Sequence, residues 1–231
     1  MSAAAAALPS SLLPVYARIG VEPVRGEGCL LHARDGRTYI DFYGGHAVAL
    51  LGYGHPRLLS ALRAQAEALF FQSNAVDLAV RERAAARLAR FAPPGLDRVF
   101  FVNSGAEANE NALRIALRRT GRRRVVAAEG AFHGRTAAAG AVTHGAAGKW
   151  YGFPQAPFEA AFVPRGESGV FAEAVTDDTA AVILEPVQGI AGAVDLGKPY
   201  LEAAREATRR RGAMLIFDEV QCGMGRTGAA F

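Results

Sequence analysis

The feature that most constrains this chain is a repeated alternation of short, wholly apolar strands with amphipathic helices. A strand that is apolar on both faces has to be covered on both faces, since half of its side chains would otherwise stay in water. Such strands alternating with helices are typical of an α/β fold with a mainly parallel sheet sandwiched by helices. The predicted strands are residues 98–102, 125–128, 161–163, 180–184 and 213–217, and the predicted helices are residues 106–118 and 200–210.

The part of the sequence before this alternation is less regular. Residues 38–43 alternate like a strand, and residues 56–69 and 78–91 have the spacing of two helices. The alanine-rich start, residues 1–14, lacks the positive charge of a secretion signal and is expected to be a poorly ordered arm. No apolar run reaches the roughly 18 residues that cross a bilayer, so we expect a cytoplasmic protein.

The basic charge of the chain does not indicate a nucleic-acid partner. The chain has 26 lysines and arginines against 22 acidic residues, a net charge of +4, and Lys149 and Lys198 are its only lysines. The two dense arginine stretches, residues 118–124 and 209–211, fall at the ends of predicted helices, where positive charge complements the helix dipole. No aromatic residues are interleaved with them, as a nucleic-acid surface would require.

Cysteine and histidine spacing gives no metal site. Cys29 and Cys222 are far apart in sequence, which fits a reducing compartment better than a disulfide framework. The five histidines form no HxxxH pattern, and the cysteines form no CxxC.

Residues 223–228, GMGRTG, satisfy the GxGxxG pattern of dinucleotide-binding enzymes. A true fingerprint follows its strand directly and opens a helix. Here five residues separate the predicted strand from the first glycine, so we reject a nicotinamide or flavin site.

Polar motifs follow several of the predicted strands, and ligands of parallel sheets bind beyond the carboxyl ends of the strands. In the first motif, FVNSGAEANE, Ser104 and Glu107 have the spacing of a capping box. Alternatively, Gly105 lets backbone N–H groups at the start of a helix close on a phosphate. Glu107 is expected to cap the helix rather than to touch a ligand.

The second motif, AFHGRT, offers an aromatic ring and a guanidinium in one loop. Phe132 is either a core residue or a plane that stacks on a heteroaromatic cofactor. Arg135 is either a surface residue or a bidentate partner for a carboxylate. His133 is expected to support other side chains or to pack, rather than to act as a base.

In the third motif, IFDEVQ, Asp218 comes directly after an apolar strand. A carboxylate in this position needs a partner, because desolvating it is costly. It either caps the following segment or pairs with a protonated ring nitrogen of a pyridine cofactor, and Gln221 would then contact the phenolic oxygen of that ring.

Taken in order, YGGHAV, FVNSGAEANENALRIA, FHGRT, ILEPVQG and IFDEVQCGMGRTG resemble the class III aminotransferases of pyridoxal-phosphate (PLP) fold type I. Among these they look most like acetylornithine and succinylornithine aminotransferases. The resemblance runs from about Tyr16 onward. It implies that residues 1–45 form the arm and part of a small domain, and that residues 46–231 form a truncated PLP-binding large domain, so that the fold is incomplete at its C-terminus.

The resemblance also implies roles for individual residues. Ser104, Gly105 and Ala106 would surround the cofactor phosphate. Phe132 would stack on the pyridine ring, Asp218 would pair with its nitrogen, and Gln221 would contact its phenolic oxygen. Arg135 would bind the substrate carboxylate, with Tyr16 as a second candidate.

The reaction implied is transfer of an amino group from an acylated ornithine to 2-oxoglutarate, as in arginine biosynthesis, by a homodimer. Two alternatives stay open: an ω-amino-acid transaminase acting on another amine, and a PLP-binding fragment without activity. The family's cofactor-binding lysine follows the DEVQ motif by a few tens of residues, and neither lysine of this chain has that context. The chain as given is therefore expected to be inactive. The family usually has Glu after EPVQG, where this chain has Ile190, so the substrate is left open.

Overall fold

The computed structural model describes residues 11–231, which fall into two compact units that divide after Gln72. We call them the N-terminal unit and the C-terminal unit. The first ten residues of the expected N-terminal arm lie outside the described residues. The expected domain boundary after residue 45 concerns the complete aminotransferase subunit and stays a prediction.

The N-terminal unit is built on a small antiparallel sheet of order β1-β2-β3. The third strand is shorter than the predicted 38–43, because Asp41 turns the chain: its Oδ1 accepts hydrogen bonds from the backbone N–H groups of Tyr43 and Gly44. The elements are β1 (Pro23–Glu27), β2 (Leu30–Ala33), β3 (Thr38–Ile40), α1 (Gly44–Ala47) and α2 (Pro56–Ala68).

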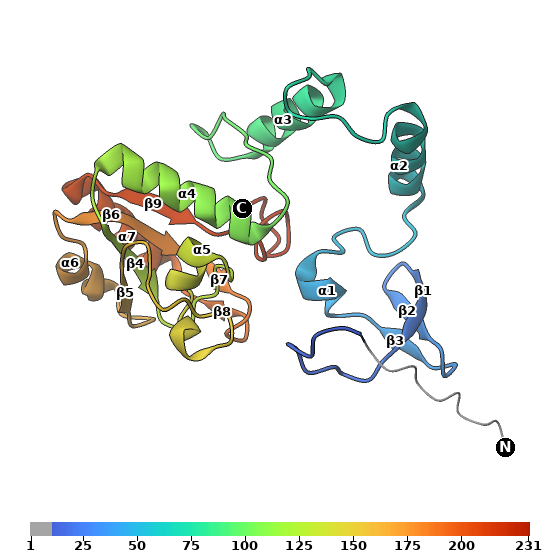
Figure 1. Ribbon diagram of the computed structural model, residues 1–231, viewed down its shortest axis with the longest axis horizontal. Coiled ribbons are helices and arrows are strands. Elements are labelled where there is room, and N and C mark those ends of the chain that lie inside the picture. Colours follow the sequence, from blue (N-terminus) through green and yellow to red (C-terminus); the bar gives the residue numbers. More distant parts are fainter. Residues whose placement is uncertain (1–10) are drawn as a thin grey trace. The chain divides into compact units, whose positions relative to one another are not determined.

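The C-terminal unit begins with α3 (Ala79–Phe91) and then forms a four-stranded parallel sheet of order β5-β4-β6-β9 (Figure 1). The predicted α/β fold with a parallel sheet is confirmed. Each strand lies within a few residues of its predicted bounds. The strands are β4 (Arg124–Ala128), β5 (Glu159–Val163), β6 (Thr179–Leu184) and β9 (Met214–Phe217).

Helices cover both faces of this sheet, as the doubly apolar strands require. On one face, α4 (Gly105–Thr120) and α5 (Ala137–Ala141) pack on Val125 and Ile183. On the other face, α6 (Phe171–Ala174) and α7 (Lys198–Arg211) pack on Val126 and Leu184. Neighbouring residues of one strand therefore enter different cores, and all six residues of β6 are buried.

The prediction of a strand at residues 98–102 is wrong. This segment has no regular secondary structure, and within residues 11–231 it joins no sheet. A strand is defined by its ladder partner, and an apolar run provides none by itself. Phe100, the third residue of the run, is two-thirds exposed.

Several short elements were not predicted, because runs of two to five residues are too short to show a period. Besides β1, β2, α5 and α6 they include the two-stranded sheet of β7 (Val187–Gln188) and β8 (Val194–Asp195).

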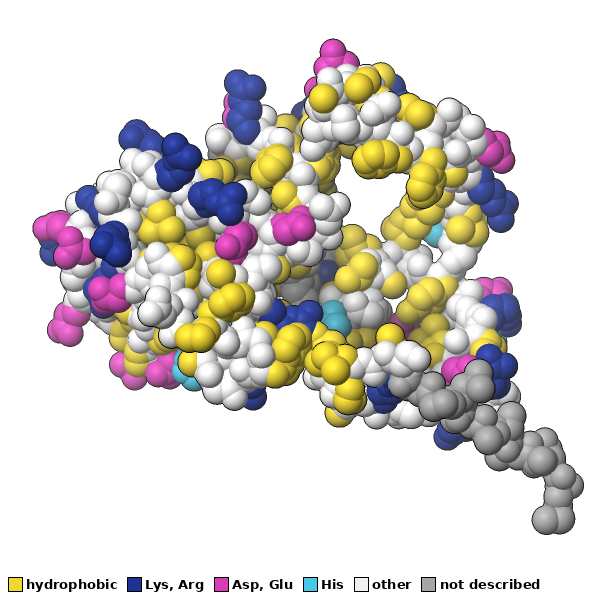
Figure 2. Space-filling view, viewed as in Figure 1, with side chains coloured by type: hydrophobic (Ala, Val, Ile, Leu, Met, Phe, Trp, Pro, Cys, Tyr) yellow, Lys and Arg dark blue, Asp and Glu magenta, His cyan; other side chains and the backbone are white. Residues whose placement is uncertain are grey.

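Large apolar side chains remain exposed on both units, and Figure 2 shows many of them as hydrophobic surface. Within the described part of the chain, neither α2 nor α3 has a buried residue. The most exposed of the large apolar side chains are those of Ile19, Phe42, Leu13, Val48, Phe70 and Phe71.

Candidate active site

The candidate site lies at the carboxyl edge of the parallel sheet, where the loops after β4, β6 and β9 meet the start of α4. The space around two glycines shows how closely these segments approach each other. Gly134, in the loop after β4, has φ +132°, and a Cβ there would lie 2.7 Å from the Cβ of Ala106 in α4. A Cβ on Gly105 would lie 2.8 Å from Val220, which follows β9. The polar motifs that follow β4 and β9 therefore meet at the start of α4, and a hydrogen bond from the backbone of Phe132 to Glu185 brings in the motif after β6, as predicted.

Asp218 is the centre of a buried polar cluster, with 6% of its surface exposed. Its Oδ2 accepts hydrogen bonds from the side-chain amide of Asn109 at 2.7 Å and from Nδ1 of His133 at 2.8 Å. Its Oδ1 accepts one bond, from the backbone N–H of Val220 at 3.1 Å. Asp218 thus caps the segment that follows it, which was one of the two roles considered in the sequence analysis. It also makes two long-range contacts.

His133 is buried and fixed from both sides. Its backbone N–H donates to the hydroxyl of Thr143, and that hydroxyl lies within hydrogen-bond distance of the carbonyl of Gly134. Asn109 also donates to the carbonyl of His133, so the same amide holds both His133 and Asp218. The other ring nitrogen, Nε2, is buried and has no hydrogen-bond partner among the described residues.

Glu185, directly after β6, supports the loop that carries Phe132. Its carboxylate accepts hydrogen bonds from the backbone N–H groups of Phe132 at 2.8 Å and of Gly189 at 3.4 Å. Burial raises the pKa of Glu185, and these N–H donors and the nearby His133 oppose that shift. The backbone of Phe132 is thereby held at this end of the sheet.

Ser104 and Glu107 form the predicted helix cap. Ser104 is the N-cap of α4, and its hydroxyl accepts from the backbone N–H of Glu107 at 3.1 Å. The Glu107 carboxylate reaches back to the backbone N–H of Asn103 at 2.7 Å. Gly105 and Ala106 form the first turn of this helix, where backbone N–H groups lack partners within the helix.

Gln221 lies against the loop after β7. A Cβ on Gly189 would collide with its side-chain amide, so a larger residue there would require Gln221 to move. The Oε1 atom of Gln221 is buried without a hydrogen-bond partner among residues 11–231. Ile190 follows Gly189 and is half exposed, which places the residue that departs from the family pattern next to the contact of Gln221.

Arg135 is exposed and ends the same loop, just before α5. Its neighbour Thr136 donates to the carboxylate of Glu110 at 2.6 Å, and the backbone N–H groups of Ala138 and Ala139 donate to the same carboxylate. The start of α5 is therefore tied to α4, and the backbone of Arg135 is held between two fixed residues.

The remaining candidate, Tyr16, belongs to the N-terminal unit and is exposed. Of the two lysines, Lys198 opens α7 and pairs with Glu202 at 3.6 Å. Lys149 follows a short 3₁₀ helix, Ala146–Gly148.

Sequence reasoning missed Asn109 and Glu110 as partners of the site. It placed Glu185 in a segment at the carboxyl end of a strand but gave this residue no role. Asn109 and Glu110 stand in the motif that was singled out, with a spacing of one helical turn or more from Ser104. Both are polar residues of α4, and their partners lie in segments that are distant in sequence. The sequence of the helix alone therefore does not show which residues they bind.

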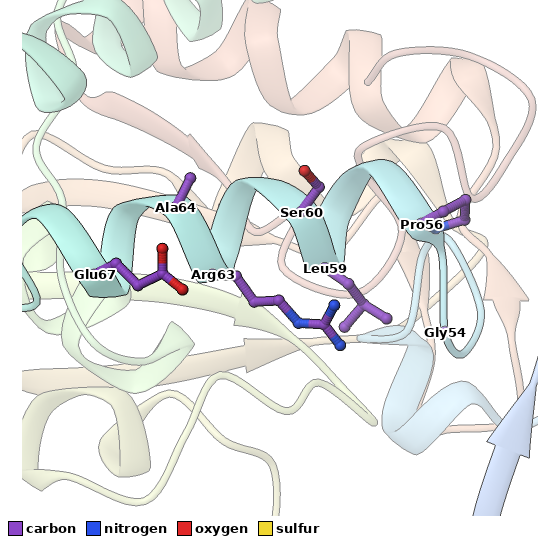
Figure 3. A pocket seen from close by; sticks show the side chains of 7 residues that line it. All are labelled: Gly54, Pro56, Leu59, Ser60, Arg63, Ala64 and Glu67. Atoms are coloured by element: carbon purple, nitrogen blue, oxygen red, sulfur yellow. The ribbon is translucent and has the colours of Figure 1, made fainter.

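A hollow lies along α2 in the N-terminal unit. Its volume is about 430 Å³, and Figure 3 shows that its lining comes from one helix and the turn before it. None of the motif residues lines it.

Among the described residues there is no group of three histidine, cysteine or acidic side chains that could hold a metal ion. No helix in residues 11–231 is long and apolar enough to cross a membrane.

Comparison with known proteins gives consistent matches. The family model for class-III aminotransferases matches residues 15–231. An acetylornithine aminotransferase from Streptomyces clavuligerus is 46% identical over 221 residues, 95% of this chain and 54% of that protein. One from Methanothermobacter thermautotrophicus is 41% identical over 222 residues, again 95% of this chain and 56% of that protein.

Solved structures match in fold as well. The ornithine aminotransferase of Toxoplasma gondii, whose active site is described as partly occupied by PLP, has a TM-score of 0.87 at 30% identity, over 96% of this chain and 53% of that one. The N-acetylornithine aminotransferase of Stenotrophomonas maltophilia has a TM-score of 0.75 at 33% identity, over 93% and 54%. The chain thus spans about half the length of the relatives it matches.

Proposed function

The chain belongs to the class-III aminotransferases, and on that basis we propose that it forms the cofactor-binding part of an enzyme that moves an amino group from acetylornithine to 2-oxoglutarate. Its fold is that of the PLP enzymes of fold type I, and its cofactor is PLP. The support for the substrate is that relatives at 41–46% identity are acetylornithine aminotransferases. The proposal is made for the complete subunit, since this chain spans about half of those relatives.

The buried polar atoms fit a heteroaromatic phosphate ligand. Nε2 of His133 and Oε1 of Gln221 are buried without partners in residues 11–231, and buried polar atoms rarely stay unpaired. Rotation of the Gln221 amide presents an N–H donor at the same position, suited to a phenolic oxygen. The start of α4, with the small residues Gly105 and Ala106, offers N–H groups and a positive dipole end to a phosphate, and the Ser104 hydroxyl lies beside them.

The observation that carries the proposal is Asp218 with its three donors. When bound, PLP supplies an electron-poor ring that draws electrons from the carbon bearing the amino group. The role of Asp218 is to hold a proton at the ring nitrogen, which keeps the ring electron-poor. Asn109 and His133 orient the carboxylate through Oδ2, and Oδ1, which has one donor among residues 11–231, keeps a lone pair for that proton.

Two residues of the loop after β4 have separate roles in binding. Phe132 is the plane that covers the ring, and its position depends on the hydrogen bond from its backbone to Glu185. Arg135 binds the substrate carboxylate, because its guanidinium can donate two parallel hydrogen bonds to it.

The cofactor assignment is tested by titrating the chain with PLP and following its absorbance. We expect saturable binding by the chain, and binding weakened about tenfold or more in Asp218→Asn, since a charge-assisted hydrogen bond contributes about 1.5–3 kcal/mol. Asp177→Asn, which changes an exposed carboxylate paired with Arg211, is the matched control and should bind like the parent chain. Equal binding by the Asp218 and Asp177 variants would refute the role of Asp218.

The substrate assignment is tested on the complete subunit with 2-oxoglutarate as acceptor. Acetylornithine should be used with a higher kcat/KM than unmodified ornithine or 4-aminobutyrate. A preference for 4-aminobutyrate or another ω-amine would instead favour the alternative of an ω-amino-acid transaminase. Ile190, beside the Gln221 contact, is the residue to exchange for Glu if that outcome is found.

A homodimer in the cytoplasm also belongs to this proposal. The support for a reducing compartment is that Cys29 and Cys222 are both free and lie in different units. Sedimentation analysis of the complete subunit tests the dimer.

A further inference from the structure

Arg135 lies against the face of an indole ring. Its guanidinium carbon is 5.9 Å from the ring centroid of Trp150, within the range of a cation–π contact. Trp150 is 62% exposed, although a side chain of this size usually gains most from burial. Trp150 is the single tryptophan of the chain, and the PLP contacts described above make no use of it.

The backbone around Trp150 is fixed rather than free. The N–H of Gly152 donates to the carbonyl of Lys149, and a Cβ at Gly152 would lie 2.6 Å from the carbonyl oxygen of Ala146. The ring of Tyr151 meets the indole edge-on at 5.4 Å. Arg135 is held as well, by the hydrogen bonds of Thr136 and the first turn of α5 to Glu110. Both partners of the contact therefore start from constrained backbones.

An indole stacks on the face of a guanidinium, whereas a carboxylate binds the N–H groups at its edge, so the two contacts do not compete for the same surface. The edge groups bind a carboxylate in the bidentate, in-plane manner. Stacking also reduces the rotamer freedom of a long side chain, which otherwise has to be ordered when the ligand binds.

We propose that Trp150 is a positioning residue of the substrate site, which stacks on Arg135 and holds its guanidinium ready for the carboxylate of the amino-acid or 2-oxo-acid substrate. This inference rests on the proposed function, because it takes Arg135 as the carboxylate receptor. It adds Trp150, which lies outside the motifs quoted in the sequence analysis, to the substrate site. The ligands that it assigns to this site are carboxylates, including dicarboxylates.

The fluorescence of the single tryptophan tests the contact directly. Succinate, a dicarboxylate without an amino or keto group, is titrated into the chain, with chloride at equal ionic strength as the control. We expect a saturable change in Trp150 emission with succinate only, and no change in the Arg135→Gln variant. Arg165→Gln, which alters another exposed arginine of the same unit, should respond like the parent chain. An absent response in the parent chain, or an unchanged response in Arg135→Gln, would overturn the proposal.

Calorimetry with succinate tests whether the ring itself matters. Trp150→Leu should weaken succinate binding about two- to fivefold, the size of an exposed cation–π contact. Trp150→Phe keeps an aromatic face and should recover most of the affinity. Equal losses in the Leu and Phe variants, or no loss in either, would show that Trp150 does not position Arg135.

The failure of this inference can be told apart from failure of the proposed function. PLP absorbance and succinate binding are measured on the same protein. Normal PLP binding with no succinate response of Trp150 overturns the inference alone. A succinate response that depends on Arg135, found in a protein that does not bind PLP, supports the inference and counts against the cofactor assignment.

Discussion

Three carboxylates around the candidate site, Glu110, Glu185 and Asp218, accept hydrogen bonds from backbone N–H groups. Each also joins two segments that are distant in sequence: Glu110 ties α4 to α5, Glu185 ties β6 to the loop after β4, and Asp218 ties β9 to α4. A buried carboxylate with fixed donors keeps its orientation, because moving it would leave the donors and the charge unpaired. At the scale of the residue, these carboxylate acceptors therefore hold the segments of the site together.

Glu185 makes stability depend on pH in a defined direction. Burial raises its pKa above the ordinary value of 4.5, so the folded chain holds this proton at a pH at which the unfolded chain has lost it. The contribution of Glu185 to the free energy of unfolding is therefore largest below pH 4.5 and falls as pH rises through the folded-state pKa. Relative to Glu185→Gln, the parent chain should lose stability over that interval, measured by urea unfolding at several pH values. A constant difference between the two proteins would contradict the raised pKa.

Arg135 can be separated from the cofactor contacts by its kinetic effect. In the complete subunit, Arg135→Ala should lower kcat/KM for carboxylate substrates about ten- to a hundredfold, the loss of one charge-assisted contact of about 1.5–3 kcal/mol. PLP affinity should stay within about twofold, since we propose that Arg135 binds the substrate carboxylate and not the cofactor. Steady-state kinetics and PLP titration check both parts. A parallel loss of PLP affinity would assign Arg135 to the cofactor instead.

At the scale of elements, the site depends on how closely the loop after β4 packs on the start of α4. Gly134 is the contact point: its φ of +132° is a conformation that side chains avoid, and a Cβ there would meet both Ala106 and Ala139 at 3.0 Å or less. The motif FHGRT thus requires its glycine for packing and for backbone conformation together.

Gly134→Ala should destabilise the fold by at least about 2 kcal/mol, the sum of backbone strain and overpacking. Gly148→Ala is the matched control, because a Cβ at Gly148 meets no other described residue within 4 Å and its φ is not positive. Chemical denaturation of the two variants gives the comparison. If both lose the same stability, the close contact between the loop and α4 is not what selects glycine.

At the scale of the whole molecule, the described chain leaves apolar surface and a strand edge open. Within residues 11–231, β9 pairs only with β6, so its other edge carries free backbone groups. Met214 and Phe217 on this strand are both more than one-third exposed. Unpaired edges and exposed apolar patches favour association between molecules.

We therefore expect the chain by itself to associate in a concentration-dependent manner, which sedimentation velocity would detect. Met214→Lys, which places a charge on the open edge, should reduce the association, while Ile115→Lys on the exposed side of α4 serves as a control for added charge alone. An equal effect of both variants would show that the edge of β9 is not the site of association.

The two lysines of the chain allow a test of covalent cofactor attachment. Neither Lys149 nor Lys198 stands in a motif, and Lys198 pairs with Glu202 on the exposed side of α7. Borohydride reduction in the presence of PLP, followed by peptide mapping, should label neither lysine more in the folded chain than in urea. Stoichiometric labelling of one lysine only in the folded state would identify it as an attachment site.

Much of this architecture could be predicted from the sequence, because its signals are local. Wholly apolar runs such as 125–128 and 180–184 gave β4 and β6, helical spacing gave α4 and α7, and the Ser104–Glu107 spacing gave the helix cap. These patterns depend on neighbours within one turn or one strand. The order of the motifs also predicted that polar residues gather at the carboxyl edge of the sheet.

Other features were decided only by the tertiary structure. Residues 98–102 have the composition of a strand but lack a ladder partner in the described chain, and hydrogen bonding to a neighbour is what makes a strand. Asn109 reaches Asp218 across 109 positions, and Trp150 meets Arg135 from a separate loop. Such contacts join segments that are distant in sequence, and the sequence of one segment does not show which other segment it contacts. Packing of the sheet brings them together, because burying the apolar faces of its strands fixes where every loop at its edge must lie.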